Sequence, residues 1–166
     1  MNYKIIGRHL GMIAIVLAVA MLPSVACGFW YGEYGAIGAF VASIAICAAV
    51  GVGLRWATRN ADDVMHQRES LALVGFSWIG AAVLGALPFI FSGTLANPVD
   101  AVFESMSGFT TTGSTVLTDI EAASRSMLFW RSFTQWLGGI GIVVLFIAVL
   151  PYLGAGGKKL ISLESP

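Results

Sequence analysis

Six consecutive residues, TTTGST at positions 110–115, carry the side chains best suited to chemistry in this chain. Five of them bear a hydroxyl group, and the sixth, Gly113, can adopt the positive φ that lets successive backbone carbonyls turn toward one axis. A ring of such carbonyl and hydroxyl oxygens can replace the hydration shell of an alkali cation. The strip 110–115 therefore has two interpretations, an ion selectivity filter or an outside loop of Thr and Ser turns.

A short helix is predicted immediately before this strip, over Pro98–Phe109. Asn97 is a favourable N-cap, Pro98 suits the first helical position, and Asp100 falls in the first turn, where the helix dipole favours an anion. A helix of about 12 residues spans roughly 18 Å, whereas the bilayer core is about 30 Å thick. We therefore expect a re-entrant pore helix whose negative C-terminal end is directed at the strip.

Two charged residues flank the strip, Glu104 in the short helix and Arg131 in the next apolar segment. Glu104 is expected either to brace the strip, by accepting hydrogen bonds from its amides or by pairing with Arg131, or to lie solvated at the outer surface. An unpaired carboxylate inside a membrane is costly, so the brace requires a partner or a proton. Arg131 is expected either to be that partner or to snorkel to the outer interface.

The composition is that of an integral membrane protein. Hydrophobic residues make up 57% of the 166 residues and charged residues only 11%, against about 25% charge in soluble domains. The formal net charge is zero, which gives no indication of nucleic-acid binding. Neither His9 nor His66 is placed to serve as the base for a hydroxyl nucleophile, so we expect no enzyme and no cofactor.

Four apolar segments are long enough to span a bilayer. They cover residues 9–27, 35–54, 71–92 and 126–151, and an aromatic turn is expected at 28–34. The expected fold class is an all-α membrane protein with four transmembrane helices plus the re-entrant pore helix and filter loop. The chain divides into a leading helical pair (1–56), a loop (57–70), a pore repeat (71–154) and a tail (155–166).

Basic residues are distributed unevenly between the two faces of this topology. One face carries Lys4, Arg8, Arg55, Arg59, Arg68, Lys158 and Lys159, and the other carries Arg125 and Arg131. Because short cytoplasmic loops are enriched in Lys and Arg, both termini are expected in the cytoplasm. Four acidic residues would then surround the outer mouth and raise the local cation concentration: Glu33, Asp100, Asp119 and Glu121.

Three runs, ESMSGFTTTGSTVL, LFWRSFTQWLGGIGIVVL and LPYLGAGG, resemble the TrkH/TrkG/KtrB family of bacterial potassium-uptake proteins. The resemblance implies an inner-membrane transporter, embedded in lipid, whose chain folds as four repeats of helix, pore helix, filter and helix. It also implies pairing as dimers and association with a cytosolic nucleotide-binding regulatory subunit. It assigns to the first filter segment Thr110, Thr111, Thr112, Gly113 and Ser114, of which Thr111, Thr112 and Gly113 would bind potassium.

The sequence holds one such repeat and not four. One repeat supplies a quarter of a ring of carbonyls, so either four chains assemble or further repeats complete the pore. The function expected is potassium uptake through Thr110–Ser114, driven by the membrane potential. The alternative is a non-conducting fragment or membrane subunit that needs further repeats or partner chains.

Overall fold

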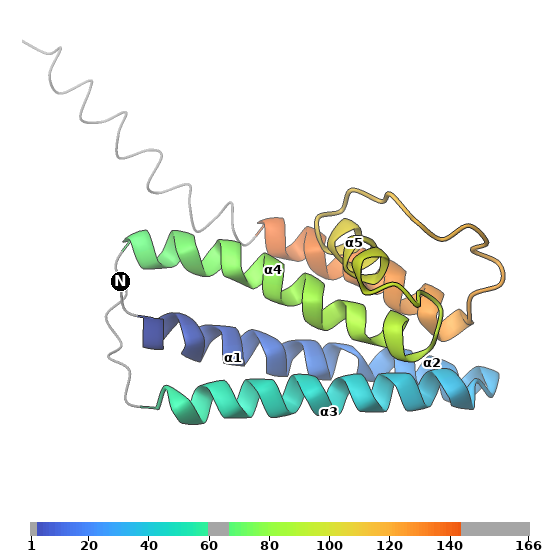
Figure 1. Cartoon of the computed structure of the whole chain (residues 1–166), viewed down its shortest axis with the longest axis horizontal. Helices are drawn as coiled ribbons and strands as arrows, with labels where there is room; N and C mark the ends of the chain where they lie inside the picture. The colour runs from blue at the N-terminus through green and yellow to red at the C-terminus, as the bar shows by residue number, and fades with distance from the viewer. Residues whose placement is uncertain (1–2, 60–66, 144–166) are drawn as a thin grey trace, which may run out of the picture.

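The computed structural model describes residues 3–59 and 67–143, and all the regular structure in these two ranges is helical (Figure 1). This confirms the all-α expectation for the described part of the chain. The helices are α1 (Tyr3–Ala20), α2 (Leu22–Tyr31), α3 (Tyr34–Ala57), α4 (Gln67–Phe91) and α5 (Pro98–Phe109). A further helix runs over 125–143, up to the end of the described residues.

The long helices lie side by side, with α1 and α2 continuing in nearly one direction and α3 returning beside them (Figure 1). Helix α4 packs on both α1 and α3. Small residues allow the closest contact, because a Cβ on Gly11 would lie 2.8 Å from the carbonyl oxygen of Gly51. A Cβ on Gly51 would in turn lie 2.7 Å from the carbonyl oxygen of Gly11. The backbones of α1 and α3 therefore touch at this point, as glycine permits in membrane helices.

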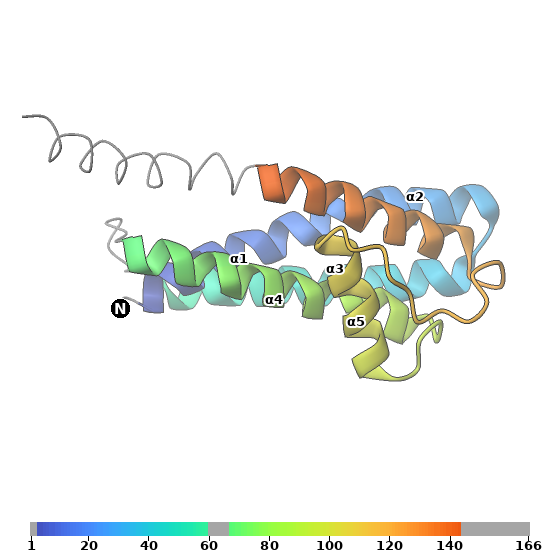
Figure 2. The same ribbon diagram turned by 90° about the horizontal axis from the view of Figure 1, so that it is seen from above.

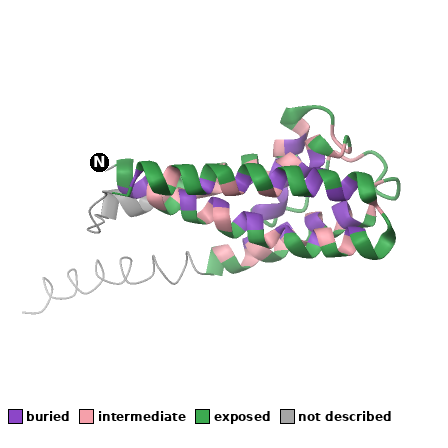
Figure 3. Cartoon of the chain, turned by 90° about the horizontal axis from the view of Figure 1, so that it is seen from below, coloured by how far each residue is buried: buried purple, intermediate pink, exposed green. Residues whose placement is uncertain are grey.

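Three runs of helix are long and apolar enough to cross a membrane within the described residues: Tyr3–Tyr31, Tyr34–Ala57 and Ala72–Phe91. They contain most of the first three predicted spans. The fourth predicted span, 126–151, extends past residue 143 and so lies partly outside the described residues. Residues on the outward sides of the helices are mostly exposed (Figure 3), and many of the exposed residues are large and apolar, as helices that face lipid require.

The predicted aromatic turn at 28–34 is wrong over its first four residues, because α2 continues to Tyr31. Gly32 ends the helix with φ 70°, and the amide of Glu33 donates to the carbonyl oxygen of Gly28 at 2.9 Å. A single glycine in the left-handed region is enough to terminate a helix in this way. The connection to α3 is therefore only two residues long, and it places Glu33 at the tip of a tight hairpin.

Helix α5 has the predicted bounds and the predicted N-cap, since the side chain of Asn97 accepts a hydrogen bond from the amide of Val99 at 3.0 Å. It runs across the long axis of the bundle (Figure 2) and packs on α4. The strip 110–115 and the return loop that follows it lead from the end of α5 to the start of the 125–143 helix (Figure 1).

Trp130 joins four helices at the centre of the structure. Its side chain is fully buried, and its ring packs edge-on against Phe40 of α3 and Phe109 of α5. Its indole N–H donates to the carbonyl oxygen of Gly85 in α4 at 3.0 Å. Because a buried tryptophan N–H needs a partner, this bond fixes the depth of the 125–143 helix relative to α4.

Glycines let the neighbouring helices approach the C-terminal end of α5. A Cβ on Gly85 would lie 2.6 Å from the ring of Phe109, and one on Gly138 would collide with the backbone of Phe109, carbonyl oxygen included. On α5 itself, a Cβ on Gly108 would collide with the hydroxyl of Thr134. The end of α5, where the strip begins, is therefore held between α4 and the 125–143 helix by close contacts at glycines.

Gly138 and Gly139 provide a matched test of this packing. Gly138→Ala forces the 125–143 helix away from Phe109, and overpacking of this kind costs about 1–3 kcal/mol. Gly139→Ala meets no atom within 4 Å, so it should raise the stability of the helix by about 0.5–1 kcal/mol. Thermal unfolding in detergent measures both changes, and equal effects of the two variants would contradict the contact.

Candidate functional site

The backbone amides of the strip are turned back onto α5. Thr110 donates to the carbonyl oxygen of Met106 at 2.8 Å, and Thr111 donates to that of Gly108 at 2.9 Å. The amides of Thr112 and Gly113 share the carbonyl oxygen of Ser107, at 3.0 and 3.4 Å. Four successive N–H groups of the strip are thus satisfied by the last turn of the helix.

The carbonyl groups of the strip are left facing the other way. In a trans peptide the C=O of one residue points opposite to the N–H of the next, so the carbonyls of Thr110, Thr111 and Thr112 point away from α5. No hydrogen bond among the described residues uses the carbonyl oxygens of residues 110–113. Residues 110–115 are all exposed, so these oxygens form an open, one-sided row of acceptors.

Two residues of the strip adopt the left-handed region. Gly113 has φ 77°, as predicted, but Thr111 also has φ 58°, which is unusual for a residue branched at Cβ. Strain of this type costs of order 1–3 kcal/mol and persists where the surroundings impose it. The surroundings here include the hydroxyl of Thr110, which donates to Met106 at 2.8 Å and lies 2.8 Å from the Thr112 hydroxyl.

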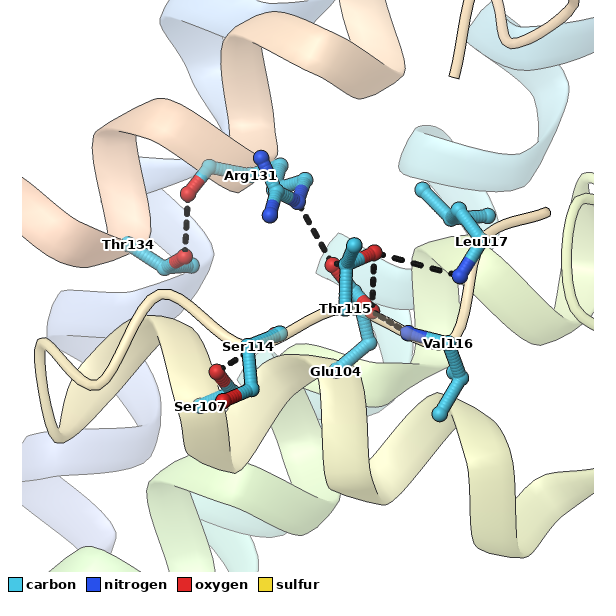
Figure 4. A network of polar contacts seen from close by, with 8 residues as sticks. All are labelled: Glu104, Ser107, Ser114, Thr115, Val116, Leu117, Arg131 and Thr134. Carbon is cyan, nitrogen blue, oxygen red and sulfur yellow. Dashed lines mark hydrogen bonds and ion pairs between the residues drawn. The ribbon is translucent and has the colours of Figure 1, made fainter. Parts of the chain in front are cut away.

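Glu104 lies at the junction between α5 and the end of the strip. Its side chain is buried, with 2% of the residue exposed, so a solvated outer position is wrong. Its carboxylate accepts bonds from the Thr115 hydroxyl at 2.9 Å, the Val116 amide at 3.0 Å and the Arg131 Nε at 2.5 Å (Figure 4). The expected contact with Arg131 is therefore present, whereas the amide that Glu104 accepts from is that of Val116, one residue after the strip, and the strip itself is bound through the Thr115 hydroxyl.

Two hydroxyl groups complete this arrangement: that of Ser107, which was not predicted to contribute, and that of Thr115, which was predicted as part of the strip but without a partner. Ser107 donates to the carbonyl oxygen of Ser114 at 2.6 Å, which ties the far end of the strip to α5 (Figure 4). Thr115 bonds Glu104 and also accepts from the amide of Leu117 at 3.1 Å. The spacing of Ser107 and Ser114, seven residues apart across a helix end, gives no sequence signal for this bond.

Glu33, one of the four acidic residues predicted around the outer mouth, is held by hydrogen bonds to the start of another helix. Its carboxylate accepts from the amide of Arg125 at 2.7 Å, the amide of Ser126 at 3.0 Å and the Ser126 hydroxyl at 2.6 Å. These two amides belong to the first turn of the 125–143 helix, whose N–H groups lack partners within the helix. Glu33 therefore caps a helix that begins 92 residues after it in the chain.

Burial raises the pKa of the Glu33 carboxyl, but hydrogen bonds from Ser126 and Arg125, together with the Arg125 charge, outweigh that effect. The net result is a pKa below the ordinary value of 4.5. The guanidinium of Arg125 is held close by, 4.8 Å from the ring centre of Tyr31. Glu33 is therefore ionised at neutral pH, as a cap on the positive end of a helix dipole should be.

A double-mutant cycle on Glu104 and Arg131 tests the buried pair. Glu104→Gln and Arg131→Gln each leave one charge without its partner, which costs about 3–5 kcal/mol for a buried pair. The double variant removes both charges and should lose clearly less than the sum of the two single losses. Thermal unfolding in detergent provides the comparison, and strictly additive losses would show that the two side chains do not interact.

The Glu33 cap predicts a specific dependence of stability on pH. A carboxyl whose pKa is lower in the folded state contributes stability above its unfolded pKa, and loses it as pH falls through the folded value. Glu33→Gln should therefore be less stable than the unmutated chain at pH 7, by about 1 kcal/mol as for loss of an N-cap.

This difference should shrink below pH 4.5 and vanish at more acid pH, where Glu33 is protonated in both states. Melting curves of the two proteins between pH 7 and pH 3 measure it. A difference that stays constant over this range would contradict an ionised cap.

Known proteins resemble this chain over nearly all of its length. A family model described as TrkH, cation transport protein, matches residues 36–166. The Trk system potassium uptake protein TrkH of Halomonas elongata is 36% identical over the whole chain, and that of Escherichia coli is 37% identical. The crystal structure of the potassium transporter TrkH from Vibrio parahaemolyticus superposes with a TM-score of 0.86 at 32% identity, over 95% of this chain.

The chain spans 34% of the length of each of these relatives. The family model covers most of the chain and includes α4, α5, the strip and the 125–143 helix. Together with three helices long and apolar enough to cross a bilayer, this shows a membrane protein, and the chain belongs to the TrkH family of cation transport proteins.

Proposed function

We propose that this chain contributes one segment of the selectivity filter of a potassium-uptake protein, formed by Thr110–Ser114, with Thr111, Thr112 and Gly113 as potassium ligands. The observation that carries the proposal is the orientation of the strip. The amides of residues 110–113 donate to α5, and the carbonyl oxygens of the same exposed residues accept no hydrogen bond within the described part of the chain. Such oxygens are the groups that replace water around an alkali cation.

The electrostatics of α5 favour a cation at the same place. The C-terminal end of a helix carries a partial negative charge, and α5 ends at Phe109, directly before the strip. The Glu104 carboxylate lies beneath the strip, but its charge is matched by Arg131. The strip therefore offers neutral oxygens in a mildly negative field, which lets an ion enter without binding it too tightly to leave.

One strip supplies only one side of a coordination shell, so the pore requires further strips. The relatives named above are about three times as long as this chain, and repeats of the same kind in the remaining length would complete the ring. We propose that the termini lie in the cytoplasm of a bacterial cell and that the membrane potential drives uptake. Each charge gains about 2.3 kcal/mol per 100 mV, enough for about 50-fold accumulation.

Rubidium uptake by cells that lack their own potassium importers tests the proposal. The chain is expressed alone and, in a chimera, as a replacement for the first third of the Escherichia coli relative. The intact Escherichia coli relative is the positive control. The chimera should transport rubidium, and Gly113→Asp should abolish transport because the variant strains φ and places a carboxylate among the carbonyls.

The matched control is Gly93→Asp, which changes another glycine with positive φ, 74°, in the loop between α4 and α5. It should retain uptake, since a Cβ at this position would meet no atom within 4 Å. A chimera that reaches the membrane but transports nothing would refute the filter proposal. Uptake by the chain alone would mean that four copies assemble. Uptake by the chimera only would favour the alternative, in which the chain is a subunit that needs further repeats.

A further inference from the structure

Glu33 connects a turn that lies just before the match to the family model with a helix inside that match. It lies in the α2–α3 turn, before residue 36, where the match to the family model begins. The helix that it caps, 125–143, lies wholly inside the matched part. The tip of the leading hairpin thus makes a specific polar contact with the helix that follows the strip.

The cap is not supplied locally, although a residue suited to it is present. Ser124 precedes the helix at the N-cap position, but its hydroxyl lies 3.3 Å from the Ser126 hydroxyl and makes no bond to a backbone amide. The amides of Arg125 and Ser126 are taken up by Glu33 instead. Carboxylate bonds to amides at a helix N-terminus are charge-assisted and stronger than those of a serine hydroxyl.

Two further contacts hold the hairpin against the same turn. The Arg125 guanidinium lies over the Tyr31 ring at the end of α2. At Gly28, a Cβ would meet Ile37 at 2.8 Å and the Cβ of Ser126 at 3.6 Å, so α2 already lies against the start of the 125–143 helix. The position of this helix is therefore set from the hairpin as well as from α4 and α5.

The same helix carries the residue that fixes the Glu104 side chain. Arg131 lies six residues after Arg125, between one and two turns further along a continuous helix. Its Nε is 2.5 Å from Glu104, which in turn holds Thr115 and Val116. A small shift or rotation of the helix start would lengthen the contact with Glu104, because the helix moves as a rigid rod over this distance.

We propose that Glu33 is a positioning residue for the strip: it holds the 125–143 helix in the register at which Arg131 fixes Glu104, and thereby Thr115 at the end of the strip and Val116 directly after it. Glu33 touches no residue of the strip itself. Its effect on ions rests on the function proposed above, whereas its effect on the strip backbone does not.

Amide hydrogen exchange of the purified chain in detergent tests the structural step. Glu33→Gln should raise exchange about fivefold to tenfold at Arg125 and Ser126, as for loss of a cap, and should also raise it at Val116, whose amide is bonded to Glu104. Glu33→Asp keeps the carboxylate and should restore protection at Val116 at least in part. Faster exchange confined to the 125–126 amides would overturn the proposal.

Glu121→Gln is the matched control, because it removes an acidic side chain that makes no hydrogen bond among the described residues. It should leave exchange at Val116 unchanged. An equal rise at Val116 in this variant would mean that the loss of negative charge, and not the cap, loosens the strip, and would also overturn the proposal.

Cation preference in the chimera provides the functional readout. Glu33→Gln should lower the ratio of rubidium to sodium uptake at least threefold, Glu33→Asp should recover it in part, and Glu121→Gln should leave the ratio unchanged. An unaltered ratio in Glu33→Gln would refute the positioning role in transport. If the unmutated chimera transports nothing, the filter proposal fails, while the exchange at Val116 still decides whether Glu33 positions the strip.

Discussion

The buried carboxylate of Glu104 is the constraint on which the arrangement around the strip depends. Removing such a charge from water costs several kcal/mol unless its oxygens are paired, and α5 alone offers no partner. The partners are Thr115 at the end of the strip, Val116 directly after it, and Arg131 on the next helix. Satisfying one charge therefore fixes where the chain leaves α5 and how near the 125–143 helix must lie.

The parts of the fold that were predictable from the sequence are those with local determinants. The bounds of α5 depend on Asn97, Pro98 and the end of the helical pattern at Phe109, and the structure has the same bounds. The positive φ of Gly113 follows from its residue type. The turn at 28–34 was predicted too long because its aromatic residues were interpreted as interfacial, whereas the left-handed conformation of Gly32 alone ends α2.

Other features depend on contacts that the sequence does not display. Glu33 and the helix start that it caps are 92 residues apart, so composition could place Glu33 among the outer acids but could not pair it. The sequence does not distinguish the adjacent glycines Gly138 and Gly139, yet only Gly138 lies against the backbone of Phe109. The positive φ of Thr111 runs against the preference of a Cβ-branched residue, and it results from the bonds that hold the strip to α5.

The exposed carbonyl row places a requirement on whatever surrounds this chain in the membrane. Every backbone polar group in a bilayer must be satisfied, and non-helical backbone is stable there only against protein or a water-filled cavity. The amides of residues 110–113 meet this requirement within the chain, but the carbonyl oxygens of the same residues do not. They need either donors from another protein segment or water and cations in a cavity. The second possibility agrees with the filter proposed above: because these oxygens are acceptors whose own amides are already bonded to α5, a strand or helix that covered them would have to bring donors without acceptors.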